Sequence, residues 1–199
     1  KILEQDETFA IGTNEEYKSV RFGLFAEEEI TAADGTFIPA NGLIAEISLD
    51  ENMKAVFSEK LPFAKYYVRE IAADEHYILS DEKYSVDFTY QGQETEVVSI
   101  DCGEFENKLK RGTVKGLKVG EYNKPLENAV FGLFKSDCTE FTKENALITV
   151  KSDDKGCFSF DDIPYGEYVI REIKAPDGYI LSDETFSLKC LPQDSLCSA

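Results

Sequence analysis

The sequence has little of several residue types on which common sites depend. It contains no tryptophan, one histidine (His76) and five cysteines, and no two cysteines form a CxxC pair. Structural zinc sites take cysteine and histidine ligands at short spacings, so we expect no metal site of that kind. A glycine-rich phosphate loop, a GxSxG elbow and an HExxH motif are also missing. We therefore predict that the protein needs neither a metal nor a cofactor.

Basic residues and long apolar runs are also scarce. Lysine and arginine number 21 against 39 acidic residues, which gives a formal net charge of -18. Phosphate backbones and anionic membranes repel such a polyanion, so we expect no nucleic acid and no membrane contact. No apolar run approaches the roughly 18 residues of a membrane span, although the chain can still be part of an anchored protein. A hydrophobic content of 42% is nevertheless typical of a folded protein.

The chain contains an internal repeat. Three blocks occur twice: Phe22–Phe25 as Phe131–Phe134, Leu61–Ile71 as Ile163–Ile173, and Tyr77–Glu82, unchanged, as Tyr179–Glu184. The offset falls from 109 residues at the first block to 102 at the other two, so the first copy has seven extra residues between positions 26 and 60. We expect two homologous domains, residues 1–110 and 111–199, with a short linker near 108–112.

Each copy has the pattern of β-structure. Residues 84–90 and 55–58 alternate apolar and polar side chains, which is the period of a strand. Turn-forming sequences separate the apolar runs at 50–53, 153–156 and 175–178, and they explain the local acidic pairs better than calcium binding does. This spacing predicts an all-β sandwich or barrel. The one helical candidate is a short segment at 26–31.

The strand in the second repeated block carries an arginine and a glutamate on opposite faces. Glu70 shares a face with Tyr66 and Val68, and Arg69 lies on the other; Glu172 and Arg171 are the equivalents in the second copy. Both faces are otherwise apolar, so one charge should lie against the core, and alternation does not decide which. Burial would favour the neutral form of a glutamate, whereas arginine can bring its head group to water.

Two further polar residues share a face with apolar positions. Lys118 is in line with Val114 and Gly116, and Asn107 is in line with Phe105 and Leu109. A lysine among core positions becomes a neutral amine more readily, because burial disfavours the ammonium form. The alternative is a lysine at a sheet edge that points to water.

These motifs resemble those of a known family. FGLF, LPxxxYxVRE, YILSDE and FENKLKRG, followed by KVxExxKPLxxAxFGLF, are similar to the Cna-B or SpaA-type prealbumin-like domains of Gram-positive pilins and cell-wall adhesins. The resemblance implies two tandem immunoglobulin-like (prealbumin-like) β-sandwiches in an extracellular, cell-wall-anchored protein. It implies a stalk or adhesin module with no enzyme activity beyond a self-catalysed isopeptide bond. Its partners would be further domains of the same protein or neighbouring pilin subunits.

The implied bond joins a lysine on the first strand to an asparagine on the last, beside an acidic residue. Residue by residue, the resemblance assigns the acid to Glu70 and Glu172, the amide to Asn107, and the second lysine to Lys118. In the first copy the lysine is Lys1, with Lys18 as the alternative. The alternative stays open because Lys1 precedes the FGLF block by 21 residues, whereas Lys118 precedes it by only 13.

The second copy departs from this pattern. The asparagine equivalent to Asn107 would fall near position 209, and residues 185–199 contain no asparagine. Asp194 is the acidic residue that could replace it, but Asp194 follows Pro192, which cannot donate to a strand ladder. We therefore expect the second copy to lack its last strand, and Lys118 and Glu172 to remain an unreacted, charged pair.

Two other functions compete with a structural stalk. A ligand-binding adhesin domain could recognise a host protein or glycan through the insertion at 26–60, where Phe37 is the aromatic residue that favours it. A glycosidase needs two carboxyl groups about 5–10 Å apart, but a chain with 39 acidic residues always offers such a pair. The carboxylate argument for an enzyme therefore has no weight.

Overall fold

A computed structural model describes residues 1–31, 34–58, 60–90, 92 and 98–190. These residues form strands with two short 3-10 helices, Glu16–Ser19 and Glu121–Asn123, so the predicted all-β class is confirmed. None of the helices in this part of the chain is long and apolar enough to cross a membrane. The chain divides into two compact units, Lys1–Asp6 with Ala10–Lys108 and Glu7–Phe9 with Leu109–Ala199.

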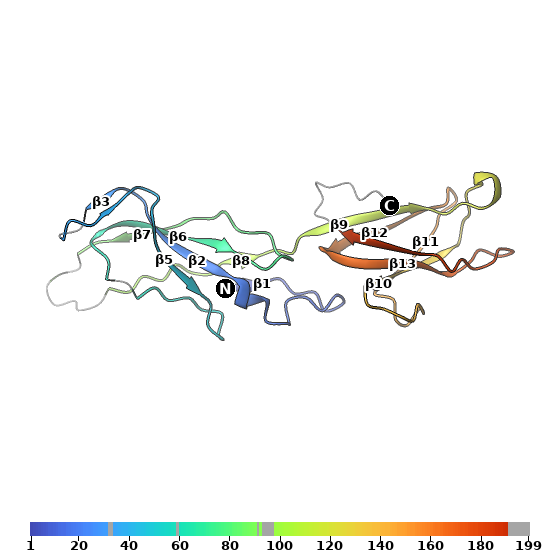
Figure 1. Ribbon diagram of the computed structural model, residues 1–199, viewed down its shortest axis with the longest axis horizontal. Coiled ribbons are helices and arrows are strands. Elements are labelled where there is room, and N and C mark those ends of the chain that lie inside the picture. The colour runs from blue at the N-terminus through green and yellow to red at the C-terminus, as the bar shows by residue number, and fades with distance from the viewer. Residues whose placement is uncertain (32–33, 59, 91, 93–97, 191–199) are drawn as a thin grey trace. The chain divides into compact units, whose positions relative to one another are not determined.

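The first unit is built on a four-stranded antiparallel sheet. Its order is β5 (Leu43–Ser48), β2 (Arg21–Ala26), β6 (Ala64–Ala72) and β7 (Tyr84–Phe88) (Figure 1). A second, parallel pair joins β1 (Ile2–Leu3) to β8 (Glu106–Asn107), and a small hairpin joins β3 (Ile30–Thr31) to β4 (Phe37–Ile38). The first and last strands of this unit are therefore direct neighbours.

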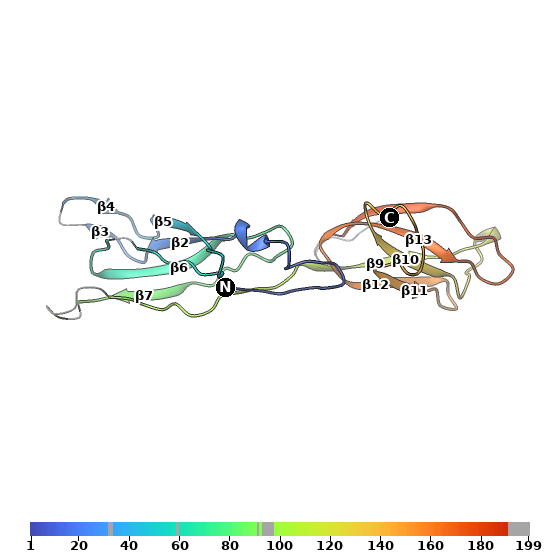
Figure 2. The same ribbon diagram turned by 90° about the horizontal axis from the view of Figure 1, so that it is seen from below.

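The second unit repeats the four-stranded sheet of the first. Its four-stranded sheet has the order β11 (Ile148–Lys151), β10 (Val130–Lys135), β13 (Gly166–Lys174) and β14 (Thr185–Cys190), and Figure 2 shows β10 beside β13. A second sheet pairs β12 (Cys157–Pro164) with β9 (Arg111–Leu117). The register is also repeated, since Phe22 faces Glu70 and Phe131 faces Glu172, each next to a register shift.

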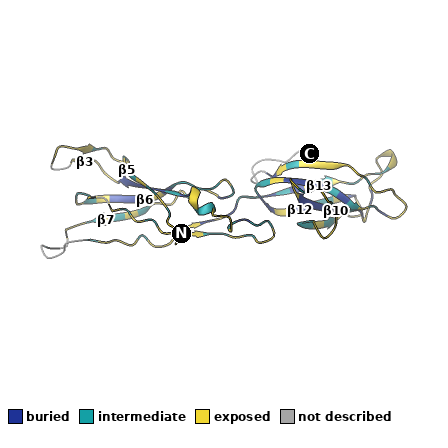
Figure 3. Cartoon of the chain, turned by 60° about the horizontal axis from the view of Figure 1, so that its bottom comes forward, coloured by how far each residue is buried: buried dark blue, intermediate teal, exposed yellow. Residues whose placement is uncertain are grey.

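The repeated sequence blocks supply the cores. The FGLF blocks lie on β2 and β10, and their residues are buried, which Figure 3 shows by colour for β10. A Cβ atom on Gly23 would lie 2.5 Å from the Phe25 ring, and one on Gly132 would lie 2.6 Å from the Phe134 ring. Each glycine therefore leaves room for an aromatic ring to fold back over its own strand. Burying such a ring contributes about 1.5–3 kcal/mol to stability.

The LPxxxY and IPxxxY spacings also have a local cause. The Tyr66 hydroxyl donates to the Pro62 carbonyl at 2.7 Å, and the Tyr168 hydroxyl donates to the Pro164 carbonyl at 3.0 Å. Both tyrosines are buried, so the bond satisfies a hydroxyl that would otherwise be costly to remove from water. The four-residue spacing thus ties the start of the strand to the segment before it, which is a loop at Pro62 and the end of β12 at Pro164.

The acidic turn residues make local hydrogen bonds. Asp50 Oδ1 accepts from the Asn52 and Lys54 amides, and Asp153 Oδ1 accepts from the Lys155 and Cys157 amides. These bonds are those of Asx turns, in which the side chain substitutes for a backbone acceptor. The turn interpretation of the two segments is therefore confirmed.

Three expectations about local structure are wrong. The helical candidate at 26–31 is instead the end of β2 and the start of β3, because Ala26 exchanges backbone bonds with the loop before β5. Residues 55–58 belong to no strand, since the two-residue β1 pairs with β8 and not with them. Arg111 and Gly112, expected in a linker, already pair with β12 as the first residues of β9.

Candidate functional site

The structure decides which charge of the central strand faces the core. Glu70 and Glu172 are buried, whereas Arg69 is exposed and Arg171 half-buried. The guanidinium of Arg69 lies 4.9 Å from the centroid of the Phe25 ring, on the outer face of the sheet. The short glutamates therefore occupy the interior, and their oxygens must find partners there.

One buried carboxylate holds the candidate site of the first unit together. Lys1 Nζ lies 3.0 Å from Glu70 Oε1, and Asn107 Nδ2 donates to Glu70 Oε2 at 2.8 Å. The side chains of Lys1 and Glu70 are 1% and 0% exposed, and Asn107 is equally buried. The carboxylate therefore brings the lysine and the asparagine, 106 positions apart in the sequence, to one place.

The strands position these groups from both ends of the unit. Lys1 directly precedes β1, and Asn107 ends β8. The Ile2 amide donates to the Phe105 carbonyl at 2.8 Å, and the Glu4 amide donates to the Asn107 carbonyl at 3.1 Å. The parallel pairing fixes the register of the two strands, so that both side chains reach the same carboxylate.

Aromatic packing anchors β8 against the sheet. The centroid of the Phe105 ring lies 4.7 Å from that of Phe22 and 3.9 Å from that of Tyr84. The Tyr77 hydroxyl, whose pKa is raised to about 12 chiefly by burial, donates to the Glu4 carbonyl at 2.9 Å. These contacts exclude water from the lysine and the amide.

Two partners of the site were not predicted. The Ser80 amide donates to Glu70 Oε2 at 3.0 Å, and the Ile78 carbonyl accepts from Asn107 Nδ2 at 2.8 Å. Both belong to the YILSDE block, which is identical in the two copies. The identical block in both copies was the sequence signal for these two partners. The sequence does not show which backbone groups of the block would form hydrogen bonds.

The electrostatics of Lys1 favour an amine nucleophile. Its pKa is lowered because burial penalises the ammonium form, and the hydrogen bond and charge of Glu70 offset only part of that effect. Asn107 Oδ1 makes no hydrogen bond within the described part of the chain. The site therefore combines a lysine whose ammonium form is disfavoured with an amide whose oxygen can accept a further hydrogen bond.

The other candidate lysine lies on the surface. Lys18 Nζ contacts Glu15 Oε2 at 2.5 Å, and its side chain is 59% exposed. This contact raises the pKa of Lys18, chiefly through the hydrogen bond to Glu15, so its charged form is favoured. Of the two candidates, the structure brings only Lys1 to Glu70.

In the second unit, the structure brings the lysine and the glutamate together. Lys118 Nζ lies 3.0 Å from both Glu172 Oε1 and Glu172 Oε2, and the Ser182 amide donates to Oε2 at 3.0 Å. The Lys118 side chain is 19% exposed, so this pair is wetter than its counterpart. No asparagine among the described residues is hydrogen-bonded to Glu172, and Asp194 lies outside the part of the chain that is described.

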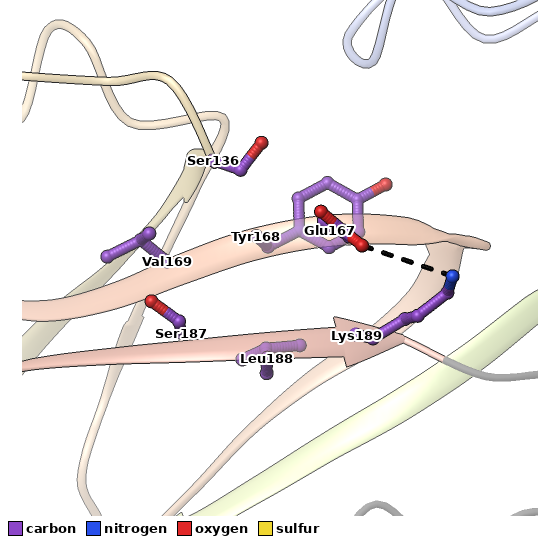
Figure 4. A pocket seen from close by; sticks show the side chains of 7 residues that line it. All are labelled: Ser136, Glu167, Tyr168, Val169, Ser187, Leu188 and Lys189. Carbon is purple, nitrogen blue, oxygen red and sulfur yellow. Dashed lines mark ion pairs between the residues drawn. The ribbon is translucent and has the colours of Figure 1, made fainter.

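The second unit also has a shallow hollow on its surface. It lies over β13 and β14 (Figure 4), where Lys189 Nζ is 3.9 Å from Glu167 Oε1. The two residues face each other across the strand pair, so this is an ordinary cross-strand ion pair. It does not involve the buried glutamates.

We expect the lowered pKa of Lys1 to appear in a pH titration of stability. In an Asn107→Ala chain the lysine stays in place without the amide. The folded state then loses the Lys1 proton at a lower pH than the unfolded chain, where the ordinary value of 10.5 applies. Unfolding takes up a proton in that interval, so the free energy of unfolding should rise with pH there.

Urea denaturation at a series of pH values below 10.5 measures this slope. A Lys1→Met, Asn107→Ala chain is the matched control and should lack this contribution. Equal slopes in the two variants would show that the Lys1 pKa is not lowered in the folded state.

Comparison with known proteins identifies the fold. The family model described as the SpaA prealbumin-like fold domain matches residues 9–101 and again residues 112–195. No curated protein sequence gives a significant match. The two matches cover most of the chain and confirm the resemblance expected from the motifs.

Solved structures of other proteins share this fold. The Bacillus anthracis TIE protein has 23% identity and a TM-score of 0.63 over 88% of this chain, and the match spans 28% of that protein's chain. A C-terminal fragment of the pilus adhesin SpaC from Lactobacillus rhamnosus GG has 16% identity and a TM-score of 0.55, over 99% of this chain and 84% of that one. At these identities the likeness concerns the fold alone. The chain belongs to the family of SpaA prealbumin-like fold domains and carries two of them in tandem.

Proposed function

We propose that this chain is a structural stalk or adhesin module of a Gram-positive cell-surface or pilus protein, in which a Lys1–Asn107 isopeptide bond closes the first unit. The observation that carries the proposal is the single buried Glu70 carboxylate, which contacts Lys1 Nζ at 3.0 Å and Asn107 Nδ2 at 2.8 Å. All three groups are buried. Burial favours the neutral forms of the lysine and the glutamate, whereas water would stabilise their charged forms.

The reaction needs no external reagent. A proton passes from the Lys1 ammonium to Glu70, which leaves a neutral amine and a neutral acid. The amine attacks Cγ of Asn107, and the neutral acid, which lies 2.8 Å from Nδ2, gives its proton to that leaving nitrogen while the attacking amine loses a proton. The C–N bond to Nδ2 breaks, ammonia leaves, and a Lys1 Nζ–Asn107 Cγ amide remains. Folding supplies the proximity that replaces a collision in solution.

The position of the bond suits a protein under tension. It would join β1 and β8, which are paired over only Ile2–Leu3 and Glu106–Asn107. Hydrogen bonds of so short a ladder are individually weak, about 1 kcal/mol each. A covalent link between the first and last strands would transmit force without separating them.

The setting also supports a surface role. The family assignment and the fold shared with a pilus adhesin fragment fit a repeated module of a surface protein. We extend this to an extracellular, cell-wall-anchored location, with further domains of the same protein or neighbouring pilin subunits as partners. The ligand-binding alternative depends on Phe37, which is 60% exposed. One exposed aromatic residue is ordinary on a protein surface, so we do not favour that alternative.

Intact-mass measurement tests the proposal. The folded chain should be lighter than its sequence mass by about 17 Da, one ammonia. Lys1→Met should abolish the deficit because it removes the nucleophile, whereas Lys18→Met, the matched control, should keep it. A wild-type chain of full sequence mass, or a deficit lost in Lys18→Met and kept in Lys1→Met, contradicts the proposed bond.

A further inference from the structure

Tyr77 is a buried side chain beside the proposed bond, and the proposed reaction gives it no role. It is 1% exposed, and its hydroxyl donates to the Glu4 carbonyl at 2.9 Å. A buried hydroxyl needs a hydrogen-bond partner, and here the partner lies 73 positions away in the sequence. The bond therefore joins the segment after β6 to the chain directly after β1.

Glu4 is bound on both sides of its α-carbon. Its amide donates to the Asn107 carbonyl at 3.1 Å, and its carbonyl accepts from Tyr77. The parallel ladder before it is short, since β1 and β8 are joined by two residue pairs. Few hydrogen bonds hold so short a ladder in register. Tyr77 therefore fastens the end of the ladder at which the reacting Asn107 lies.

The backbone that follows Tyr77 contacts the reacting groups directly. The Ile78 carbonyl accepts from Asn107 Nδ2 at 2.8 Å, and the Ser80 amide donates to Glu70 Oε2 at 3.0 Å. One short segment thus touches the first strand, the amide and the acid. In these contacts Tyr77 acts through its side chain, whereas Ile78 and Ser80 act through their backbone. A substitution can therefore remove the tyrosine contact alone.

Among its described residues, the second unit arranges the equivalent groups differently. Tyr179, the counterpart of Tyr77, is 43% exposed. Glu121 occupies the position of Glu4 in the repeat, three residues after the lysine. The Glu121 carbonyl accepts from the Lys124 amide at 3.2 Å. The carbonyl after the first strand thus has a local donor in this unit and a distant tyrosine in the first.

The lysine and the acid of the second unit meet all the same. Lys118 Nζ lies 3.0 Å from Glu172 Oε1, although Tyr179 lies at the surface. Contact between the lysine and the acid therefore does not depend on the tyrosine. In the first unit the buried tyrosine adds the attachment between the first and last strands, and this attachment sets where the amide lies relative to the amine.

The hydroxyl of Tyr77 is suited to holding a position and not to moving a proton. Burial is the chief cause that raises its pKa to about 12, so it stays a protonated donor at lower pH. It donates to a backbone carbonyl, whereas the reacting groups are the side chains of Lys1, Glu70 and Asn107. Its effect on those groups is therefore exerted through the backbone of Glu4.

We propose that Tyr77 is a positioning residue for the Lys1–Asn107 bond. Its hydroxyl holds the end of β1 in the register that brings Lys1 Nζ to Asn107 Cγ, and it takes no part in proton transfer. This inference rests on the proposed function. A misplacement of about 1 Å can slow a reaction between bound groups by about a hundredfold. Loss of the hydroxyl should therefore slow bond formation and leave the fold in place.

The test follows bond formation in newly made protein. The full chain is produced by cell-free synthesis, translation is stopped, and samples quenched in urea at intervals are weighed for the loss of about 17 Da. Tyr77→Phe keeps the ring and removes the hydroxyl, and we expect it to form the bond at least about tenfold more slowly than the wild type. Tyr66→Phe is the matched control, because it also removes a buried hydroxyl bound to a backbone carbonyl, at 2.7 Å from Pro62. It should keep the wild-type rate.

A second measurement separates position from stability. In chains that also carry Asn107→Ala no bond can form, so urea denaturation compares the two tyrosine variants without it. Each variant loses one hydrogen bond of the same kind, so the two denaturation midpoints should shift by similar amounts. Circular dichroism checks that both variants fold. A slower reaction in Tyr77→Phe alone then reports position and not stability.

The outcomes distinguish this inference from the function on which it rests. A wild-type chain that never loses the mass of ammonia overturns the proposed function and the role of Tyr77 with it. If the wild type reacts and Tyr77→Phe reacts as fast as Tyr66→Phe, the positioning role is overturned and the proposed function stands. Equal slowing of both variants also overturns the role, because lost stability then accounts for it. Slowing of Tyr77→Phe alone, with matched midpoints, supports it.

Discussion

Replacing Asn107 with alanine is expected to lower the free energy of unfolding of the first unit by about 4–5 kcal/mol. The proposed bond closes a loop of about 100 residues, and a cross-link over such a loop stabilises chiefly by restricting the unfolded chain. Chemical denaturation followed by far-UV circular dichroism measures the change. Hydrogen exchange in β2 and β6 assigns it to the first unit.

Asn52→Ala is the matched control. Asn52 lies exposed in a turn of the same unit, so its loss should change stability by less than about 0.5 kcal/mol. If Asn107→Ala costs no more than the control, the first unit carries no covalent closure.

Replacing Glu70 with alanine should have the largest effect of any single substitution at the site. It removes the group that brings Lys1 and Asn107 together, so the bond should not form. It also leaves the Lys1 ammonium buried without its carboxylate, which typically costs about 3–5 kcal/mol. We therefore expect Glu70→Ala to be less stable than Asn107→Ala in the same denaturation experiment. The Glu70→Ala chain should also have the full mass of its sequence, because no ammonia is lost.

Glu172→Ala provides the comparison within the same chain. Lys118 is 19% exposed, whereas Lys1 is 1% exposed, so the Lys118 ammonium can reach water when its partner is lost. The expected cost is about 1–3 kcal/mol, mainly for the unsatisfied polar groups. Equal losses in the two variants would contradict the assignment of a cross-link to the first unit alone.

Much of the fold could be predicted from the repeat. The blocks around Phe22 and Tyr66 recur as the strand pairs β2 and β10 and β6 and β13, and the block at Tyr77 recurs as an irregular segment after the latter strands. Alternation could not decide whether Glu70 or Arg69 faces inward, because both faces of that strand are otherwise apolar. The inward choice depends on the Ser80 amide and on Asn107, which are distant in the sequence and supply the buried partners.

The remaining differences have tertiary causes. Spacing could not separate Lys1 from Lys18, because the chain between β1 and β2 is longer than its counterpart in the second copy. Only the pairing of β1 with β8 places Lys1 in the core. The segment at 26–31 was expected to be helical, but its backbone is drawn into pairing with the loop before β5 and with β4. Such contacts override local propensity.

The most direct test of the central claim is peptide mapping of the folded wild-type chain. Cleavage after glutamate residues releases Lys1–Glu4 and Asn107–Glu121 as separate peptides if no bond joins them. We predict a single linked species with the summed peptide mass less about 17 Da, fragmenting at Lys1 and Asn107 and absent from Glu70→Ala. Recovery of the two peptides separately and unmodified from folded wild-type protein would contradict the account.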